Sequence, residues 1–212
     1  MLFGRYHSYE DFSLILIKKE IGAPAVKEKK IDIPGADGEL DLTDFFGEPK
    51  YENVKLKFDF ETIIPPNGFM ALFSLIKNAI HGKKERIIFN GDPSFCYMGR
   101  CFVSSFKNEK NIGIISIECD CEPWRYKTNK TVINTAVNGA ESVILTNGRK
   151  RAVPLVTIET ESSLNIVYRD VNVWDLGAGS YTLPELELAE GDNLVTVTGT
   201  GNISFEWQEA AL

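Results

Sequence analysis

Residues 53–61, with the sequence NVKLKFDFE, alternate polar and apolar side chains without a break. Successive side chains of a β-strand point to opposite faces of a sheet, so this pattern predicts a strand with one buried face. The four apolar positions of the stretch are therefore candidate core residues. The neighbouring segments also favour β-structure, with expected strands at residues 11–17, 86–89, 96–106 and 112–121 and a hairpin loop at 107–111.

One helix is expected in the first part of the chain, over residues 68–81. Apolar residues recur there at spacings of three and four, which gives the helix one apolar face: Phe69, Leu72, Phe73, Ile76, Ala79 and Ile80. Asn67 is the expected N-cap, and Gly82 is expected to end the helix.

A basic cluster follows this helix, at His81, Lys83 and Lys84. Such a cluster could contact phosphate, or it could be ordinary chemistry at the negative end of a helix dipole. Glu85 interrupts the run, and we favour the second interpretation.

Residues 33–38, with the sequence IPGADG, predict a turn because Pro presets its own φ and Gly permits a positive φ. The flanking segments 25–33 and 39–45 are candidate arms of an extended hairpin. Lys27, Glu28, Lys29 and Lys30 on one arm, and Glu39, Asp41 and Asp44 on the other, offer opposite charges that could set a register.

The second part of the chain carries no helix signal. Short β-strands are expected at residues 132–137, 142–145, 155–160, 164–168, 194–198 and 203–207, with turns at 138–139, 147–148, 177–179, 191–193 and 199–201. Short strands at this spacing indicate a β-sandwich or jelly roll.

Charge divides the 212 residues into two parts. Residues 1–128 hold 18 basic and 19 acidic residues, whereas residues 129–212 hold 5 and 11, so nearly all of the net charge of −7 lies in the second part. All four cysteines and all phenylalanines except Phe205 lie in the first part. A compositional shift of this size predicts a domain boundary near residue 128. The acidic balance does not favour nonspecific binding to nucleic acid.

No segment resembles a signal peptide or a membrane-spanning helix, so we expect the protein in a cytosol with Cys96, Cys101, Cys119 and Cys121 as thiols. Cys119 and Cys121 would face the same side of a strand. A metal site there lacks a further ligand type nearby, and small buried thiols are the favoured interpretation. We predict no metal and no cofactor.

The sequence contains no pattern that supports catalysis. His7 stands beside Ser8, but neighbours in a strand point to opposite faces, which disfavours proton transfer between them. The carboxylates of Asp37, Glu39, Asp41 and Asp44 could suit a glycosidase, yet a solvated turn is the simpler interpretation. The aromatic groups able to stack on a sugar are those of Trp174, Tyr181 and Trp207, which could equally be core residues.

Taken in order, several motifs resemble the distal tail proteins of bacteriophages with long, non-contractile tails. They are FGRYHS at residues 3–8 with DFSL at 11–14, IPGADGELD at 33–41, HGKKER at 81–86 with DP at 92–93 and YMGR at 97–100, and ECDCEPW at 118–124. The second part matches more loosely, through GDNL at 191–194 and ISFEW at 203–207.

This resemblance implies a mainly β fold in two domains. Residues 1–128 would form a split β-barrel with one helix and an extended hairpin, and residues 129–212 a galectin-like sandwich. The first domains would join copies into a ring, by resemblance a hexamer. The ring would link the tail tube to the tail tip in the virion, could hold receptor-binding proteins, and would let DNA pass through its lumen.

Two further hypotheses remain open at this point. The second domain could bind carbohydrate through Trp174 or Trp207, although it contains no histidine and so lacks the usual galectin sugar ligand. Alternatively, the protein could be a tail-associated hydrolase that uses acidic residues.

Overall fold

The computed structural model describes residues 1–45, 47–62, 68–109 and 112–212. The chain divides into two compact units, Met1–Arg125 (unit 1) and Tyr126–Leu212 (unit 2). Both are built mainly from β-strands, and the mainly β fold expected from the sequence is confirmed. No helix in the described ranges is long and apolar enough to span a membrane.

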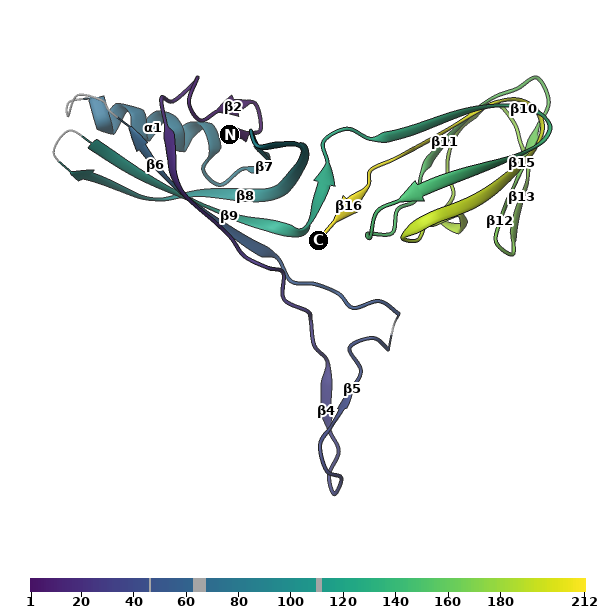
Figure 1. The fold of residues 1–212 in the computed structure, drawn as a ribbon, viewed down its shortest axis with the longest axis horizontal. Coiled ribbons are helices and arrows are strands. Elements are labelled where there is room, and N and C mark those ends of the chain that lie inside the picture. The colour runs from purple at the N-terminus through teal and green to yellow at the C-terminus, as the bar shows by residue number, and fades with distance from the viewer. Residues whose placement is uncertain (46, 63–67, 110–111) are drawn as a thin grey trace. The chain divides into compact units, whose positions relative to one another are not determined.

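Unit 1 contains a curled sheet whose strands are hydrogen-bonded in the order β2-β1-β7-β8-β9-β6-β3 (Figure 1). These strands are β1 (Leu2–Phe3), β2 (Tyr6–His7), β3 (Ile15–Ile21), β6 (Val54–Thr62), β7 (Lys84–Phe89), β8 (Asp92–Glu109) and β9 (Ile112–Lys127). The last two residues of β9 belong to unit 2, where the Lys127 N–H donates to the Glu209 carbonyl (2.9 Å) next to β16 (Ala210–Ala211).

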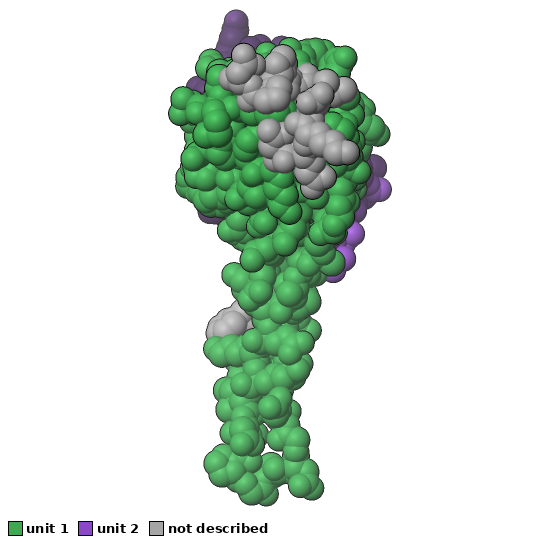
Figure 2. Space-filling view, turned by 90° about the vertical axis from the view of Figure 1, so that its left-hand side faces the viewer, with its two compact units in different colours: residues 1–125 green, residues 126–212 purple. Residues whose placement is uncertain are grey.

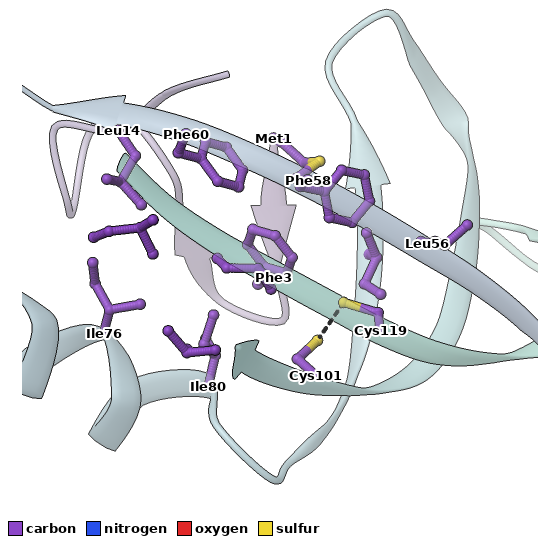
Figure 3. Packing of buried hydrophobic residues seen from close by; sticks show 14 of the residues in the cluster. Met1, Phe3, Leu14, Leu56, Phe58, Phe60, Ile76, Ile80, Cys101 and Cys119 are labelled. Carbon is purple, nitrogen blue, oxygen red and sulfur yellow. Dashed lines mark hydrogen bonds between the residues drawn. The ribbon is translucent and has the colours of Figure 1, made fainter. Parts of the chain in front are cut away.

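The strand predicted from residues 53–61 is confirmed as β6. It lies between β3 and β9, and its alternate side chains, including Phe58 and Phe60, are buried. These rings meet Phe3 of β1 edge to face, with ring centroids 6.0 and 6.1 Å apart (Figure 3). Burial of one face of β6 therefore packs the first strand of the chain, across the core, against a strand near the opposite end of the sheet order.

Helix α1 (Phe69–Ile80) covers this core with the apolar face predicted for it. Phe73 is the exception, because it is only partly buried and stacks on Phe106. The N-cap position falls on Gly68, while the predicted cap, Asn67, lies outside the described residues. Gly82 follows the helix with a φ of +75°, a value that glycine adopts without steric cost.

The predicted strand over residues 11–17 is wrong in its first half. Residues 8–12 form turns, Ser13 has a φ of +54°, and β3 begins only at Ile15. Phe12 and Leu14 are nevertheless buried, because the turn folds them onto the core under β1. Residues 110–111 of the predicted 107–111 loop lie outside the described residues, and β8 continues to Glu109.

The predicted hairpin is present, but its regular β-strands are shorter than expected. Strands β4 (Lys30–Asp32) and β5 (Glu39–Asp41) pair antiparallel around the predicted turn. Isolated backbone contacts continue the pairing toward β3 and β6, including a bridge between Val26 and Tyr51. We call residues 22–53 the arm, which leaves the body of unit 1 as a narrow projection (Figure 2).

Unit 2 is organised around a long antiparallel ribbon of β10 (Thr131–Asn147) and β15 (Gly191–Trp207), paired without a register shift along their whole length. On its other edge, β15 pairs first with β12 (Leu164–Tyr168) and then with β11 (Leu155–Glu159). Strands β13 (Val171–Leu176) and β14 (Gly179–Thr182) complete the two halves, with a short 3₁₀ helix, η2 (Pro184–Leu186). Neither β13 nor β14 was predicted from the sequence.

Three predicted turns of unit 2 are wrong: residues 191–193 are the start of β15, and the turns at 138–139 and 199–201 are bends inside the ribbon. Gly139 and Gly199 lie opposite one another, and their φ values are +94° and +132°. A Cβ at Gly199 would lie 2.6 Å from Leu164 Cδ2, so β12 packs where only glycine leaves room. Both strands bend at the same level, and the two halves of the ribbon share one core, which makes the β-sandwich. The buried residues of this core include Val137, Val143, Leu145, Val156, Ile158, Leu164, Ile166, Tyr168, Val195, Val197, Ile203, Phe205 and Trp207.

Candidate assembly surface

The arm is a two-stranded ribbon held together by its own backbone. The Glu52 N–H donates to the Ala25 carbonyl, the Lys27 N–H to the Lys50 carbonyl, and the Leu42 N–H to the Lys29 carbonyl, each at 2.8 Å. Together with the β4–β5 pairing, these bonds extend the β3–β6 pair out to the turn at residues 33–38. The arm is therefore a ribbon with regular pairing at its tip and isolated backbone contacts nearer its base, interrupted where residues 43–45 form a turn.

The arm and the strand that leads into it expose their apolar side chains. None of the described residues from 15 to 53 is buried. Exposed apolar side chains along this stretch are Ile15, Leu16, Ile17, Ile21, Val26, Ile31, Ile33, Leu40 and Phe45. So many exposed apolar side chains on one segment make it a candidate interaction surface.

Charges on the arm are paired locally. Lys30 Nζ lies 2.6 Å from a Glu28 carboxylate oxygen, and this contact raises the pKa of Lys30. Hydrogen bonding from Thr43 lowers the pKa of Asp41, which lies opposite Lys30 in the register. Asp37, Glu39 and Asp44 are exposed, as expected for a solvated turn and its flanks.

Strand β3 is the other half of the candidate surface. It forms the end of the strand order in unit 1, with β6 on one side. A groove of about 500 Å³ lies beside it, lined in part by Tyr9, Leu14, Ile15, Leu16 and Phe89. This groove was not predicted from the sequence, although the apolar run at residues 14–17, which does not alternate, was a usable signal for an exposed apolar edge.

His7 and Ser8 do not form a catalytic pair in the structure. The Met1 amino nitrogen lies 3.2 Å from His7 Nε2 and 3.4 Å from Ser8 Oγ, so both side chains contact the same amine. Asp11 contacts the backbone N–H of His7 rather than its ring. This arrangement organises the turn at the start of unit 1.

The basic cluster after α1 performs helix-end chemistry, as favoured from the sequence. Lys83 Nζ donates to the carbonyls of Asn78 (2.9 Å) and Ala79 (2.8 Å). His81 Nδ1 accepts from the Val103 N–H at 3.0 Å, and Lys84 pairs with Glu122 at 2.6 Å. These side chains neutralise the last carbonyls of the helix and join it to β8 and β9.

The four cysteines are buried free thiols in unit 1. Cys119 and Cys121 do face the same side of β9, as expected. Burial raises the pKa of the Cys121 thiol to about 12, and contact with Cys101 together with burial raises the pKa of Cys119. Within the described ranges, no group of three or more His, Cys, Asp or Glu side chains is placed to hold a metal ion.

Of the aromatic candidates in unit 2, only Trp174 is exposed, at 61% of its surface. Trp207 is buried in the sandwich core, and Tyr181 is half-buried with its hydroxyl donating to the Gly177 carbonyl at 3.0 Å. Trp207 therefore cannot stack on a sugar without unfolding the core. The structure does not gather the three side chains into one aromatic platform, since one points into the core and another is tied to its own loop.

No protein-family model matches the chain, and no curated protein sequence matches it. A solved structure from a bacteriophage adsorption apparatus, however, matches it over its whole length. This is the Dit protein of phage SPP1, with a TM-score of 0.70, 15% sequence identity and 100% coverage of both chains. The SPP1 protein is described as a paradigm of the hub adsorption apparatus in phages that infect Gram-positive hosts. The resemblance to distal tail proteins is thereby confirmed at the level of the fold.

Proposed function

We propose that the protein is a structural component of a phage tail tip, built into a ring by self-association of unit 1. The observation that carries this proposal is the arm, a strand pair with exposed apolar side chains on a sheet that ends at β3. A two-stranded ribbon alone is only marginally stable in water, so an arm of this length calls for a partner surface. The whole-length likeness to the SPP1 hub protein supports the same role.

In the proposed ring, the arm of one copy lies along the β3 edge of the next. Exposed β-edges pair readily with strands from other chains, and a head-to-tail contact repeated by rotation closes into a ring. Six copies are proposed from the resemblance to distal tail proteins. The ring would join the tail tube to the tail tip in the virion, could anchor receptor-binding proteins, and would assemble in the host cytoplasm.

The role requires no turnover, and we propose no catalytic activity. Binding of carbohydrate by unit 2 is a second proposal, which rests on the exposed ring of Trp174. A glycan array separates the two. Signal that disappears in Trp174→Ala would establish sugar recognition, and an array without signal would leave unit 2 as a scaffold.

The ring proposal is tested by shortening the arm. The Leu42 N–H donates to the Lys29 carbonyl, so residues 30–41 can be replaced by two glycines without moving the base of the arm. We expect light scattering and negative-stain images to show rings for the intact chain and monomers for the shortened chain, which should still unfold in a cooperative transition. Rings of unchanged size from the shortened chain would refute the role of the arm.

A matched control keeps the length of the arm but changes its surface. Ile31 and Leu40 lie directly opposite one another in the β4–β5 pair and are 43% and 47% exposed. The double substitution Ile31→Ser with Leu40→Ser leaves the backbone pairing available. We expect it to weaken ring formation less than the shortened arm does, because the strand edge remains.

A further inference from the structure

Cys101 on β8 and Cys119 on β9 lie in the centre of the unit 1 sheet, with their Sγ atoms 3.2 Å apart (Figure 3). Both thiols are free and buried. We propose that these two residues form a site of intrachain disulfide formation when the protein meets an oxidising environment. The proposal rests on the geometry of unit 1 and is independent of ring assembly.

The strand register places the two cysteines directly opposite each other. A Cβ built on Gly99 would lie 2.7 Å from Cys121 Cα, and the Ser104 hydroxyl donates to the Ser116 carbonyl at 3.2 Å. Gly99 thus faces Cys121, and Ser104 faces Ser116. In an antiparallel pair, the same register sets Cys101 against Cys119.

Backbone hydrogen bonds identify the type of pair. The Cys101 N–H donates to the Lys83 carbonyl (3.0 Å), and the Cys101 carbonyl accepts from the Gly82 N–H (2.7 Å). Both backbone groups of Cys101 therefore point away from β9, which makes Cys101 and Cys119 a non-hydrogen-bonded pair. In such pairs the Cα atoms are about 4.5 Å apart and the side chains are closest.

This geometry falls within the range that a disulfide accepts, which is roughly 4.4–6.8 Å between Cα atoms. The Sγ atoms must approach by about 1 Å to reach a bond length of about 2.05 Å. Small χ1 rotations of the two side chains supply that movement, so the strands need not separate. Bond formation would close a short loop across the two central strands of the sheet.

The other two cysteines lack such a partner. Cys121 faces Gly99, which has no side chain. Cys96 lies opposite Ile88 on β7, and its sulfur accepts from Arg86 Nη2 at 3.7 Å. Cys96 and Cys121 therefore provide matched internal controls within the same sheet.

The chemistry needs an oxidant of the small-disulfide class, for which oxidised glutathione serves as the probe. One protein thiolate attacks a glutathione sulfur and releases one glutathione thiol. The second protein thiolate attacks the mixed disulfide and releases another. Two protein protons are lost, and the electron pair reduces one glutathione disulfide to two thiols. Because both Sγ atoms are buried, the first attack occurs during local opening and is slow.

The test uses the purified, reduced full chain incubated with oxidised glutathione at about pH 8, where a thiol exposed by local opening has a thiolate fraction. We expect the four free thiols, counted after denaturation with Ellman's reagent, to fall to two, and the intact mass to fall by about 2 Da. A non-reduced tryptic digest should contain residues 101–107 linked to residues 111–125. The melting temperature should rise by about 5–10 °C and return on reduction.

Single substitutions identify the bond. Cys96→Ser and Cys121→Ser should both still lose two thiols, and Cys121→Ser leaves Cys119 as the one cysteine of its tryptic peptide. Cys101→Ala should retain all three of its thiols, and Cys119→Ala repeats that test should Cys101→Ala fail to fold. Four free thiols in folded, oxidised protein, or a bond to Cys96 or Cys121, would overturn the proposal. Particle size measured alongside reports on the ring separately.

Discussion

The arm and the β10–β15 ribbon both pair antiparallel segments, but only the ribbon is covered within its own unit. The ribbon bends at Gly139 and Gly199, and its two halves bury their inner faces against each other. The arm pairs regularly only over β4 and β5, it is interrupted by a turn at residues 43–45, and none of its described residues is buried. A strand pair that folds back on itself supplies its own core, whereas an arm with no buried residue needs cover from another surface. This difference is why we place self-assembly on the arm.

The largest effect should come from removing a large side chain from the inner face of the ribbon. Phe205 of β15 is fully buried in the unit 2 core, and Phe205→Ala should lower the free energy of unfolding by about 3–5 kcal/mol. Ile31→Ala in the arm should change it by less than about 0.5 kcal/mol, because that side chain already meets solvent. Urea unfolding followed by circular dichroism measures both. Equal losses would mean that the arm is packed within the monomer.

A smaller effect should come from the glycines that shape the two strand pairs. Gly199→Ala places a Cβ 2.6 Å from Leu164 Cδ2 and 2.8 Å from the Ser163 carbonyl oxygen, and it should cost about 2–4 kcal/mol. Gly35→Ala at the turn of the arm also has a positive φ, +85°, but has open space around it. It should cost about 1–2 kcal/mol at most, from backbone strain alone. Differential scanning calorimetry of the two variants checks the order, and a larger loss for Gly35→Ala would contradict the bend.

The last effect, absent near neutral pH, should be the alkaline pH dependence that Cys121 gives to the core of unit 1. Burial raises the pKa of this thiol from 9.0 to about 12, so the folded state keeps it neutral. Below the unfolded pKa the contribution is fully present. As pH rises through 9 toward 12, the unfolded chain ionises first and the stability falls. Cys121→Ala should lose less stability than the natural chain between these pH values, measured by urea unfolding at each pH. Parallel curves for the two proteins would show that burial of the thiol does not act this way.

Sequence periodicity could predict the elements that bury one face. The alternation at residues 53–61 and the spacing of three and four in α1 both report directly on a buried side, and both elements are present at nearly the predicted bounds. Periodicity gave no such guide at the dipeptides Asn138-Gly139 and Thr200-Gly201, where a turn was predicted. Glycine with a positive φ permits either a chain reversal or a bend within a strand, and only the strand packed against it selects one.

The assembly surface was predictable in part. The turn signal at residues 33–38 and its flanks located the arm, because Pro and Gly act locally on the backbone. The β3 edge and its groove were not found, since an edge exists only once the order of strands is known. The facing of Cys101 and Cys119 was likewise invisible, because their opposition depends on a register set by the whole hairpin.

By itself, the sequence determined the mainly β character, the position of the helix and the presence of an extended hairpin, because each follows from interactions between near neighbours in the chain. The tertiary structure alone decided that the ribbon bends into a sandwich, that Trp207 is buried while Trp174 is exposed, and that the arm has no cover in its own unit. Those outcomes depend on which surfaces pack against each other. That packing involves residues far apart in the chain, so local sequence patterns do not report it.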